Sequence, residues 1–285
     1  MTGRRLGVIQ MPSESEASWR RTLAKAAEGA GWLVMGADNP VLSSLGDADN
    51  ALVFVRSASE ITIGGIQDWI VFDHPTDLSV AAASARRPDL PYYGVQSVSA
   101  RRLASLLLGD LSAHVEAAAV RIDVPGLGEV KRRASEYISQ VAPIVPALAL
   151  YDRGLPQIGA SAQWGSDILN FSDYTVLPDG RIRIDLTGKT RPLIYGPYIE
   201  LPKGKWKVNV QFEAEPDEIC YLLFDWGVGD DVARCSTTIA RAGAYEIVLE
   251  HERSTPGAWE IRAWAERGHF SGAINFVSCS VEMIS

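Results

Sequence analysis

The chain has 285 residues, of which 47% are hydrophobic and 22% charged, and its formal net charge is -8. This acidic balance argues against a sequence-independent nucleic-acid binder, which needs excess Lys and Arg to neutralise phosphates, so nucleic acid is not an expected partner. No stretch approaches the ~18 apolar residues of a membrane span, and the N-terminus lacks the long apolar region of a secretory signal. The length favours two domains, and we expect a cytoplasmic protein.

The first 120 residues alternate short apolar runs with helical patterns. We expect the helix after the first run to be capped by Ser13 and closed by Gly29 and Gly31. Continuous apolar runs between helices are typical of parallel strands buried on both faces. The sequence therefore predicts an open, doubly wound α/β domain, Rossmann-like or flavodoxin-like, with about five strands. These strands are predicted at residues 6–10, 32–36, 51–55, 69–73 and 92–96, with a helical turn at 39–49.

The pattern changes twice after residue 120. Residues 121–165 predict a connector that has one helix starting near Gly128 and then a segment interrupted by proline and glycine. From about residue 166 apolar and polar residues alternate between turn signals, which is typical of a β-sandwich or jelly roll. The predicted domains are therefore 1–120, 121–165 and 166–285. The predicted sandwich strands are 173–177, 181–186, 195–201, 205–214, 219–226, 232–240, 244–251, 258–266 and 272–284.

Asp73 and His74 come at the end of the fourth predicted strand. Open α/β sheets bind ligands at the carboxyl ends of their strands, and a carboxylate beside an imidazole suits acid–base chemistry. Adjacent residues in an extended chain usually point to opposite faces, so Asp73 could instead cap the following helix and leave His74 on the surface. The pair is the candidate catalytic site of the first domain.

A second candidate in this domain is an anion or nucleotide site made of Ser13, Ser97, Ser99 and Arg101. The last three are expected at a helix N-terminus, where anions are favoured. Capping serines and solvated arginines would explain the same residues. The sequence contains no G-x-G-x-x-G after the first strand, no G-x-x-x-x-G-K-[ST] and no G-x-S-x-G. The predicted α/β fold is therefore one that nucleotide-binding proteins use, but the sequence motifs for dinucleotide binding, phosphate binding and a catalytic serine are absent.

Two polar faces are predicted in the sandwich. The first is the polar face of the strand predicted at 205–214, which is most simply exposed to solvent. It carries Lys205, Lys207, Asn209 and Gln211. The second polar face is on the strand predicted at 258–266, where Trp264 lies among the charged residues Glu260, Arg262 and Glu266. An aromatic ring in this setting suits stacking on a sugar ring while polar groups bond the sugar hydroxyls. The alternative is that Trp264 packs against the first domain or the connector. The candidate carbohydrate-binding residues are Trp264, Arg262, Trp226 and His269.

No cofactor is predicted. Trp226 lies in a glycine-rich stretch with Asp225, Asp230 and Asp231, but Ca²⁺ needs roughly six to eight ligands, so a solvated loop is favoured and a structural Ca²⁺ stays an alternative. The cysteines are three in number and lack metal spacing. We expect them to be buried free thiols in a reducing compartment.

The stretches PYIELPKGKWKVNVQFEAE, RAGAYEIVLEH and GAWEIRAWAE resemble the jelly-roll carbohydrate-binding modules, in which strands of the type G-x-Y/W-x-V-x-F follow a glycine turn. The resemblance covers about the last 110 residues. It implies glycan binding through a concave face or a loop edge, often with a structural Ca²⁺. An α/β half joined to such a module also resembles, more loosely, accessory proteins and glycosyltransferases of bacterial surface-polysaccharide synthesis.

Three functions follow as hypotheses. The first is a glycan-associated bacterial protein whose sandwich binds carbohydrate while its α/β domain binds a nucleotide sugar or a related anion. The second is a glycosyltransferase-like enzyme of polysaccharide synthesis with Asp73 or His74 as base, although a second α/β domain is missing. The third is a non-enzymatic structural or assembly protein whose sandwich makes contacts in a homo-oligomer.

Overall fold

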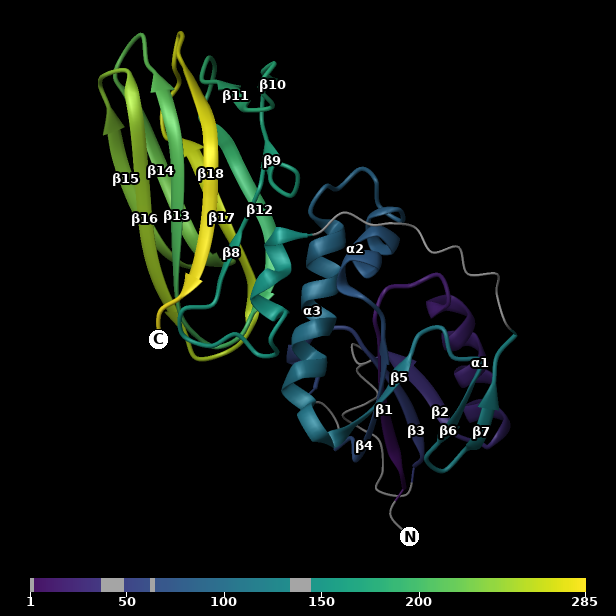
Figure 1. The fold of residues 1–285 in the computed structure, drawn as a ribbon. Helices are drawn as coiled ribbons and strands as arrows, with labels where there is room; N and C mark the ends of the chain where they lie inside the picture. Colours follow the sequence, from purple (N-terminus) through teal and green to yellow (C-terminus); the bar gives the residue numbers. More distant parts are fainter. Residues whose placement is uncertain (1–2, 37–48, 62–64, 134–144) are drawn as a thin grey trace. The chain divides into compact units, whose positions relative to one another are not determined.

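The structure is a computed structural model that describes residues 3–36, 49–61, 65–133 and 145–285. It divides into two compact units (Figure 1). The first contains Met1–Arg86 and Ser97–Ile144, and the second contains Arg87–Gln96 and Val145–Ser285. Among the described residues, no helix is long and apolar enough to cross a membrane.

The first unit is built on a five-stranded parallel sheet in the order β2-β3-β1-β4-β5. The parallel sheet predicted from the apolar runs is therefore present. Its elements are β1 Arg5–Gln10, α1 Glu16–Gly29, β2 Leu33–Gly36, β3 Ala51–Val55, η2 Ala58–Glu60, β4 Asp68–Asp73, α2 Thr76–Ser84, α3 Tyr93–Leu108, η3 Gly109–Leu111, β5 Ser112–Glu116, β6 Arg121–Val124 and β7 Gly128–Lys131. The predicted helical turn at 39–49 lies almost wholly outside the described residues.

Both faces of this sheet are covered. On one face Leu6 and Val8 of β1 pack with Trp19 of α1 and with residues of the hairpin β6–β7. On the other face Ile9 packs with Ala104 of α3. Because successive side chains of a strand point to opposite faces, a strand covered on both sides is apolar throughout, as the continuous runs of β1 and β3 are.

Gly7 in β1 is fixed by its cross-strand neighbour Trp69 in β4. A Cβ atom on Gly7 would lie 2.3 Å from the indole ring of Trp69, well inside van der Waals contact. The close packing of an aromatic ring over the central strand therefore requires glycine at this position.

The fifth strand is not the predicted one. Residues 92–96 were expected as a strand, but nearly all of them belong to helix α3, Tyr93–Leu108. The fifth strand is β5, Ser112–Glu116, which pairs in parallel with β4 at the edge of the sheet. The sequence SAHVE has no apolar run because an edge strand is largely exposed, so the pattern of a buried strand does not find it.

The predicted connector at 121–165 is not a separate part. Its start forms the hairpin of β6 and β7, which contributes Ile122, Val124 and Val130 to the core over α1. The helix expected near Gly128 is a strand over its first residues, and the rest of that prediction lies largely outside the described residues. From Val145 the chain belongs to the second unit.

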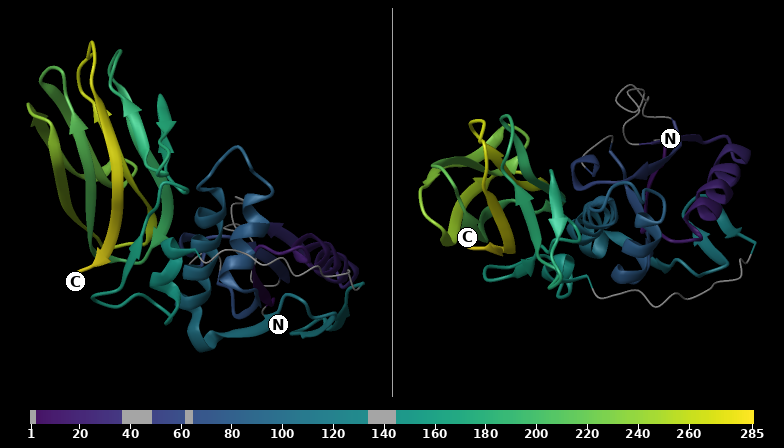
Figure 2. Two further views of the ribbon diagram at one scale, coloured as in Figure 1. Left: turned by 45° about the horizontal axis from the view of Figure 1, so that its top comes forward. Right: turned by 90° about the horizontal axis from the view of Figure 1, so that it is seen from above.

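The second unit is a two-sheet antiparallel β-sandwich, as predicted (Figure 2). One sheet, here the β13 sheet, has the order β10-β11-β18-β13-β16, with β8 also on β18; the other, the β17 sheet, has the order β15-β14-β17-β12-β9. The elements are η4 Pro146–Tyr151, β8 Ser161–Gln163, β9 Asn170–Phe171, β10 Tyr174–Val176, β11 Ile182–Asp185, β12 Arg191–Leu201, β13 Gly204–Glu215, β14 Cys220–Val228, β15 Asp231–Ile239, β16 Gly243–Arg253, β17 Gly257–Ala265 and β18 Ala273–Met283.

Aromatic side chains fill the space between the two sheets. Trp226 lies with its ring centroid 5.5 Å from that of Trp164 and 4.8 Å from that of Trp259. Phe212 of β13 stacks on Phe224 of β14 at 5.8 Å and so joins the sheets. Of the three cysteines, all free, Cys220 and Cys279 are buried while Cys235 is partly exposed, and burial raises the pKa of Cys279 to about 12.

On the solvent-exposed face of β13, polar side chains pair with side chains on the neighbouring strands. Lys205 pairs with Glu250 of β16 at 2.6 Å, and Lys207 with Glu282 of β18 at 2.5 Å. The amide of Asn209 donates to Glu246 at 2.6 Å. The lysines and the Asn209 amide nitrogen are thus paired with acids on the neighbouring strands, which agrees with a solvated sheet face.

Candidate functional site

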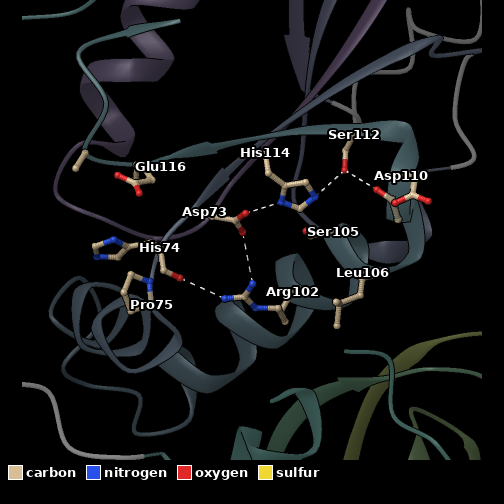
Figure 3. A pocket seen from close by; sticks show the side chains of 13 residues that line it. Asp73, His74, Pro75, Arg102, Ser105, Leu106, Asp110, Ser112, His114 and Glu116 are labelled. Carbon is tan, nitrogen blue, oxygen red and sulfur yellow. Dashed lines mark hydrogen bonds and ion pairs between the residues drawn. The ribbon is translucent and has the colours of Figure 1, made fainter. Parts of the chain in front are cut away.

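A pocket of about 880 Å³ in the first unit extends along β5, from Ser112 at the start of the strand to Glu116 at its end, and reaches the carboxyl end of β4 at Asp73 (Figure 3). Asp73 and His74 lie at the carboxyl edge of the parallel sheet, where ligands are expected in open α/β folds, whereas Ser112 lies at the amino end of β5. Its lining comes from the end of β4, from α3, from the turn at Gly109 and from β5. The residues are Asp73, His74, Pro75, Arg102, Ser105, Leu106, Gly109, Asp110, Ser112, His114, Glu116, Ala117 and Ala118.

Three side chains of the pocket form a hydrogen-bonded series. Nδ1 of His114 lies 2.5 Å from Oδ2 of Asp73, and Nε2 of His114 lies 3.0 Å from Oγ of Ser112. Figure 3 shows the imidazole between the carboxylate and the hydroxyl. Ser112 can also donate to the carbonyl oxygen of Gly109 at 3.0 Å. The order serine, imidazole, carboxylate is one that can activate a hydroxyl.

Arg102 of α3 contacts the carboxylate oxygen of Asp73 that does not face His114. Its Nη1 lies 3.5 Å from Oδ1 of Asp73, and its Nη2 donates to the carbonyl of His74 and to Oγ1 of Thr76, both at 3.2 Å. Each carboxylate oxygen of Asp73 therefore has a different partner, which fixes the orientation of the carboxylate toward His114.

Of the predicted pair, Asp73 points into the pocket but its imidazole partner is His114 and not His74. His74 also lines the pocket, where burial lowers its pKa against the opposing effect of Asp77 and Glu14. The prediction missed His114 because residues 97–119 were not expected to include a strand. In a strand, Ser112, His114 and Glu116 share one face, and the register pairs Asp73 with Glu116 on that face.

The predicted anion site is occupied by the chain itself. Ser97, Ser99 and Arg101 lie within α3 and not at its first turn, so the expected helix N-terminus is not there. Arg101 pairs with Glu16 of α1 at 3.1 Å, and Arg86 pairs with the same carboxylate at 2.5 Å. The carboxylate of Glu16 thus takes the place that a bound anion would need.

Ser13 does not cap α1. Its hydroxyl lies 3.2 Å from that of Ser15, whose side chain donates to the carbonyl of Ala117 at 2.7 Å, and the N-cap position makes no side-chain cap bond. The carbonyl of Ser13 accepts from Arg86 at 3.0 Å. Ser13 is therefore part of the packing that positions Arg86 and Glu16.

A second surface of interest is the outer face of the β17 sheet. The inward residues of β17 are buried in the core, so Glu260, Arg262 and Trp264 point outward. Trp264 is partly exposed, and its cross-strand neighbours are Leu223 of β14 and Pro192 of β12. We call this surface the Trp264 face, made of Trp264, Arg262, Glu260, Pro192, Tyr195, Tyr221, Leu223, Asp225, Arg234 and Ser236.

A charged row crosses the Trp264 face one row from the indole. Nε of Arg234 donates to Oδ1 of Asp225 at 2.7 Å, and Nη2 of Arg262 lies 3.3 Å from Oδ2 of the same carboxylate. Arg262 also lies 3.7 Å from Glu260 and donates to the carbonyl of Gly229 at 2.8 Å. Fixed donors and acceptors therefore lie beside an apolar platform.

Two predicted carbohydrate-binding residues are not on this face. Trp226 is 0% exposed and belongs to the core, where its Nε1 donates to the carbonyl of Trp206 at 3.2 Å. The expectation of a glycine-rich loop was wrong here because β14 continues to Val228. His269 is 5% exposed in the turn after β17, with its backbone bonded to Gly188.

The aspartates near Trp226 have protein partners. Asp225 is held by Arg234 and Arg262, and Asp231 pairs with His251 at 2.9 Å and with Arg253. Within the part of the chain that the structure describes, no group of three or more His, Cys, Asp or Glu side chains is arranged to hold a metal ion.

No protein-family model and no curated protein matches the chain. Among solved structures, the chain is similar to the CBM22-1 xylan-binding domain from Paenibacillus barcinonensis at 9% identity, covering 47% of this chain and 90% of that one with a TM-score of 0.28. It is similar to the xylan-binding module CBM86 from Roseburia intestinalis at 16% identity, covering 44% and 96% with a TM-score of 0.31. It is also similar to TmCBM61, solved with β-1,4-galactotriose, at 8% identity, covering 43% and 86% with a TM-score of 0.29. Similarities this low assign no function.

Proposed function

We propose that the second unit binds carbohydrate on the Trp264 face. The observation that carries the proposal is the partly exposed indole of Trp264, set between Leu223 and Pro192 one row from the charged groups of Asp225 and Arg262. A sugar ring has an apolar C–H face and hydroxyls at its rim, so it needs an aromatic platform beside fixed polar groups.

The two outer faces of the sandwich differ in this respect. The centre of the β13 face carries Lys205, Lys207, Asn209 and Gln211, whose groups are engaged with acids on the neighbouring strands. The Trp264 face combines apolar and polar groups in neighbouring rows. The proposal therefore places the ligand on the β17 sheet, with Trp264 stacking on the sugar and Arg262 and Arg234 bonding its hydroxyls.

The test is binding of the full-length protein to a broad array of glycans, with Trp264→Ala and Tyr174→Ala alongside. Tyr174 is 50% exposed on β10, outside the Trp264 face, and so controls for the loss of an exposed aromatic ring. We expect Trp264→Ala to weaken binding about tenfold or more, equivalent to about 1.4 kcal/mol, and Tyr174→Ala to leave it unchanged. Absence of binding by the unchanged protein, or equal binding by Trp264→Ala with an unaltered melting temperature, would contradict the proposal.

A nucleotide sugar in the first unit and glycosyltransferase activity remain predictions. The pocket at β4 and β5 carries the carboxyl groups of Asp73, Asp110 and Glu116 against the guanidinium of Arg102, which disfavours a diphosphate. Thermal stabilisation by a uridine diphosphate sugar would support these functions. A structural or assembly role, with homo-oligomer contacts through the sandwich, is the remaining alternative and would give concentration-dependent assembly without binding either ligand.

A further inference from the structure

The series of Ser112, His114 and Asp73 belongs to the first unit, whereas the Trp264 face belongs to the second. Each of the three side chains lines the same pocket. The side chains of His114 and Asp73 are 46% and 34% exposed, so a substrate and water can reach them.

The hydrogen bonds define where the protons lie. An ionised carboxylate only accepts, so the short contact with Asp73 places the proton of the neutral imidazole on Nδ1 of His114. Nε2 is then an acceptor that faces Oγ of Ser112 at 3.0 Å. The hydroxyl of Ser112 has two acceptors within reach, Nε2 and the carbonyl oxygen of Gly109, and the rotamer that donates to Nε2 is the one from which Ser112 can attack.

The fold holds this arrangement from several sides. Gly109 follows α3 with a φ of 50°, and the turn through η3 brings the chain into β5 at Ser112. Ser112 and His114 stand two residues apart on one face of the strand, while Asp73 comes from the end of the neighbouring strand. Arg102 occupies the second oxygen of Asp73. The positions of Ser112, His114 and Asp73 relative to one another are thus fixed by the hydrogen-bonded pairing of β4 with β5.

The charge of the pocket indicates the class of substrate. Three carboxyl groups, those of Asp73, Asp110 and Glu116, face one guanidinium, that of Arg102. Such a pocket repels phosphates and carboxylates and accepts an uncharged group. Its volume of about 880 Å³ suits a small molecule.

We propose that the first unit is a serine esterase for small uncharged carboxylic esters, with Ser112 as nucleophile, His114 as general base and Asp73 as positioning residue. Oγ of Ser112 bonds to the ester carbonyl carbon as its proton passes to Nε2 of His114. The carbon–oxygen bond of the leaving alcohol breaks, and the alcohol takes that proton. Water then gives one proton to Nε2 of His114 and bonds through its oxygen to the acyl carbon. The bond between that carbon and Oγ of Ser112 breaks, the carboxylic acid leaves, and His114 returns the proton to Oγ.

Two probes test this on the full-length chain. The first is hydrolysis of p-nitrophenyl acetate, and the second is the adduct formed by phenylmethylsulfonyl fluoride, located by peptide mass spectrometry. The variants are Ser112→Ala, His114→Gln and Asp73→Asn, with Ser59→Ala as the matched control, since Ser59 is an exposed serine of the same unit and does not line the pocket. Melting temperatures verify that each variant is folded.

We expect the adduct on Ser112, and roughly a 100-fold loss of hydrolysis or more in Ser112→Ala and His114→Gln, with Ser59→Ala within about twofold of the unchanged protein. Asp73→Asn should lower kcat with little change in KM, because Asp73 positions His114 and does not contact the ester. The proposal is overturned if the unchanged protein forms no adduct at Ser112. It is also overturned if Ser112→Ala hydrolyses the ester as fast as the unchanged protein, which would leave His114 acting alone.

Discussion

The hydroxyl of Tyr198 is hydrogen-bonded to the carboxyl of Glu260 on the Trp264 face. Tyr198 lies at a register shift of β12 and has a φ of 62°, a left-handed conformation that is uncommon for a residue with a side chain. The ring of Tyr92 packs against it with the centroids 4.9 Å apart. This cover buries Glu260, which is 6% exposed, at the edge of the proposed carbohydrate surface.

Burial raises the pKa of Glu260 above its ordinary value, against the lowering effects of Arg262 and the Tyr198 hydrogen bond. A carboxyl group whose pKa is higher in the folded state stabilises the fold fully below its unfolded pKa, and this contribution is lost as the pH rises through the folded pKa. We therefore expect Glu260→Gln to gain in melting temperature relative to the unchanged protein as the pH rises from about 4 to 7. Thermal unfolding across this range measures the difference. A difference that moves the other way would mean that the ion pair with Arg262 outweighs burial.

Glu16→Ala should create the anion site that the sequence suggested. Removing the carboxylate leaves the guanidinium groups of Arg86 and Arg101 without their shared acid, at a cost of about 2 kcal/mol in the free energy of unfolding. Inorganic phosphate should then raise the melting temperature of the variant and not that of the unchanged protein. Asp89→Ala removes the acid of an exposed ion pair and serves as the control. Stabilisation of the unchanged protein by phosphate would show that Glu16 does not block the site.

Gly7→Ala should destabilise the first unit. The added methyl group would lie 2.3 Å from the ring of Trp69 between two paired strands, and overpacking of this kind costs about 1–3 kcal/mol. Gly29→Ala is the control, because a Cβ atom there meets nothing within 4 Å at the end of α1. Urea denaturation of both variants gives the comparison, and equal stabilities would contradict the role assigned to Trp69.

Asp225→Ala should cost more stability than Arg234→Ala. Asp225 is 4% exposed and accepts from both Arg234 and Arg262, so its removal leaves two guanidinium groups without their acid. We expect a loss of about 2 kcal/mol in the free energy of unfolding. Removing Arg234 leaves Asp225 paired with Arg262, and the lost side chain is exposed. Denaturant unfolding of the two variants decides the order, and a larger loss in Arg234→Ala would contradict it.

The alternation of apolar and polar residues predicted the sandwich closely. The strand predicted at 205–214 is β13, Gly204–Glu215, and that at 258–266 is β17, Gly257–Ala265. The same alternation placed Trp264 on an outer face. It also places Trp226 in the core, because Trp226 is two residues from the buried Phe224 on the same strand, β14, which runs through Gly227 to Val228.

The amino-acid sequence by itself determined the two kinds of sheet, because burial on one or both faces leaves a local pattern in each strand. Only the tertiary structure decided the candidate site of the first unit. His114 lies 41 residues from Asp73, and Arg101 lies 85 residues from the Glu16 that neutralises it. Strand β5 is exposed at the edge of its sheet and has little apolar pattern of its own, so it becomes a strand through its hydrogen bonds to β4. Those bonds bring serine, imidazole and carboxylate together, and no local feature of the sequence encodes such a pairing.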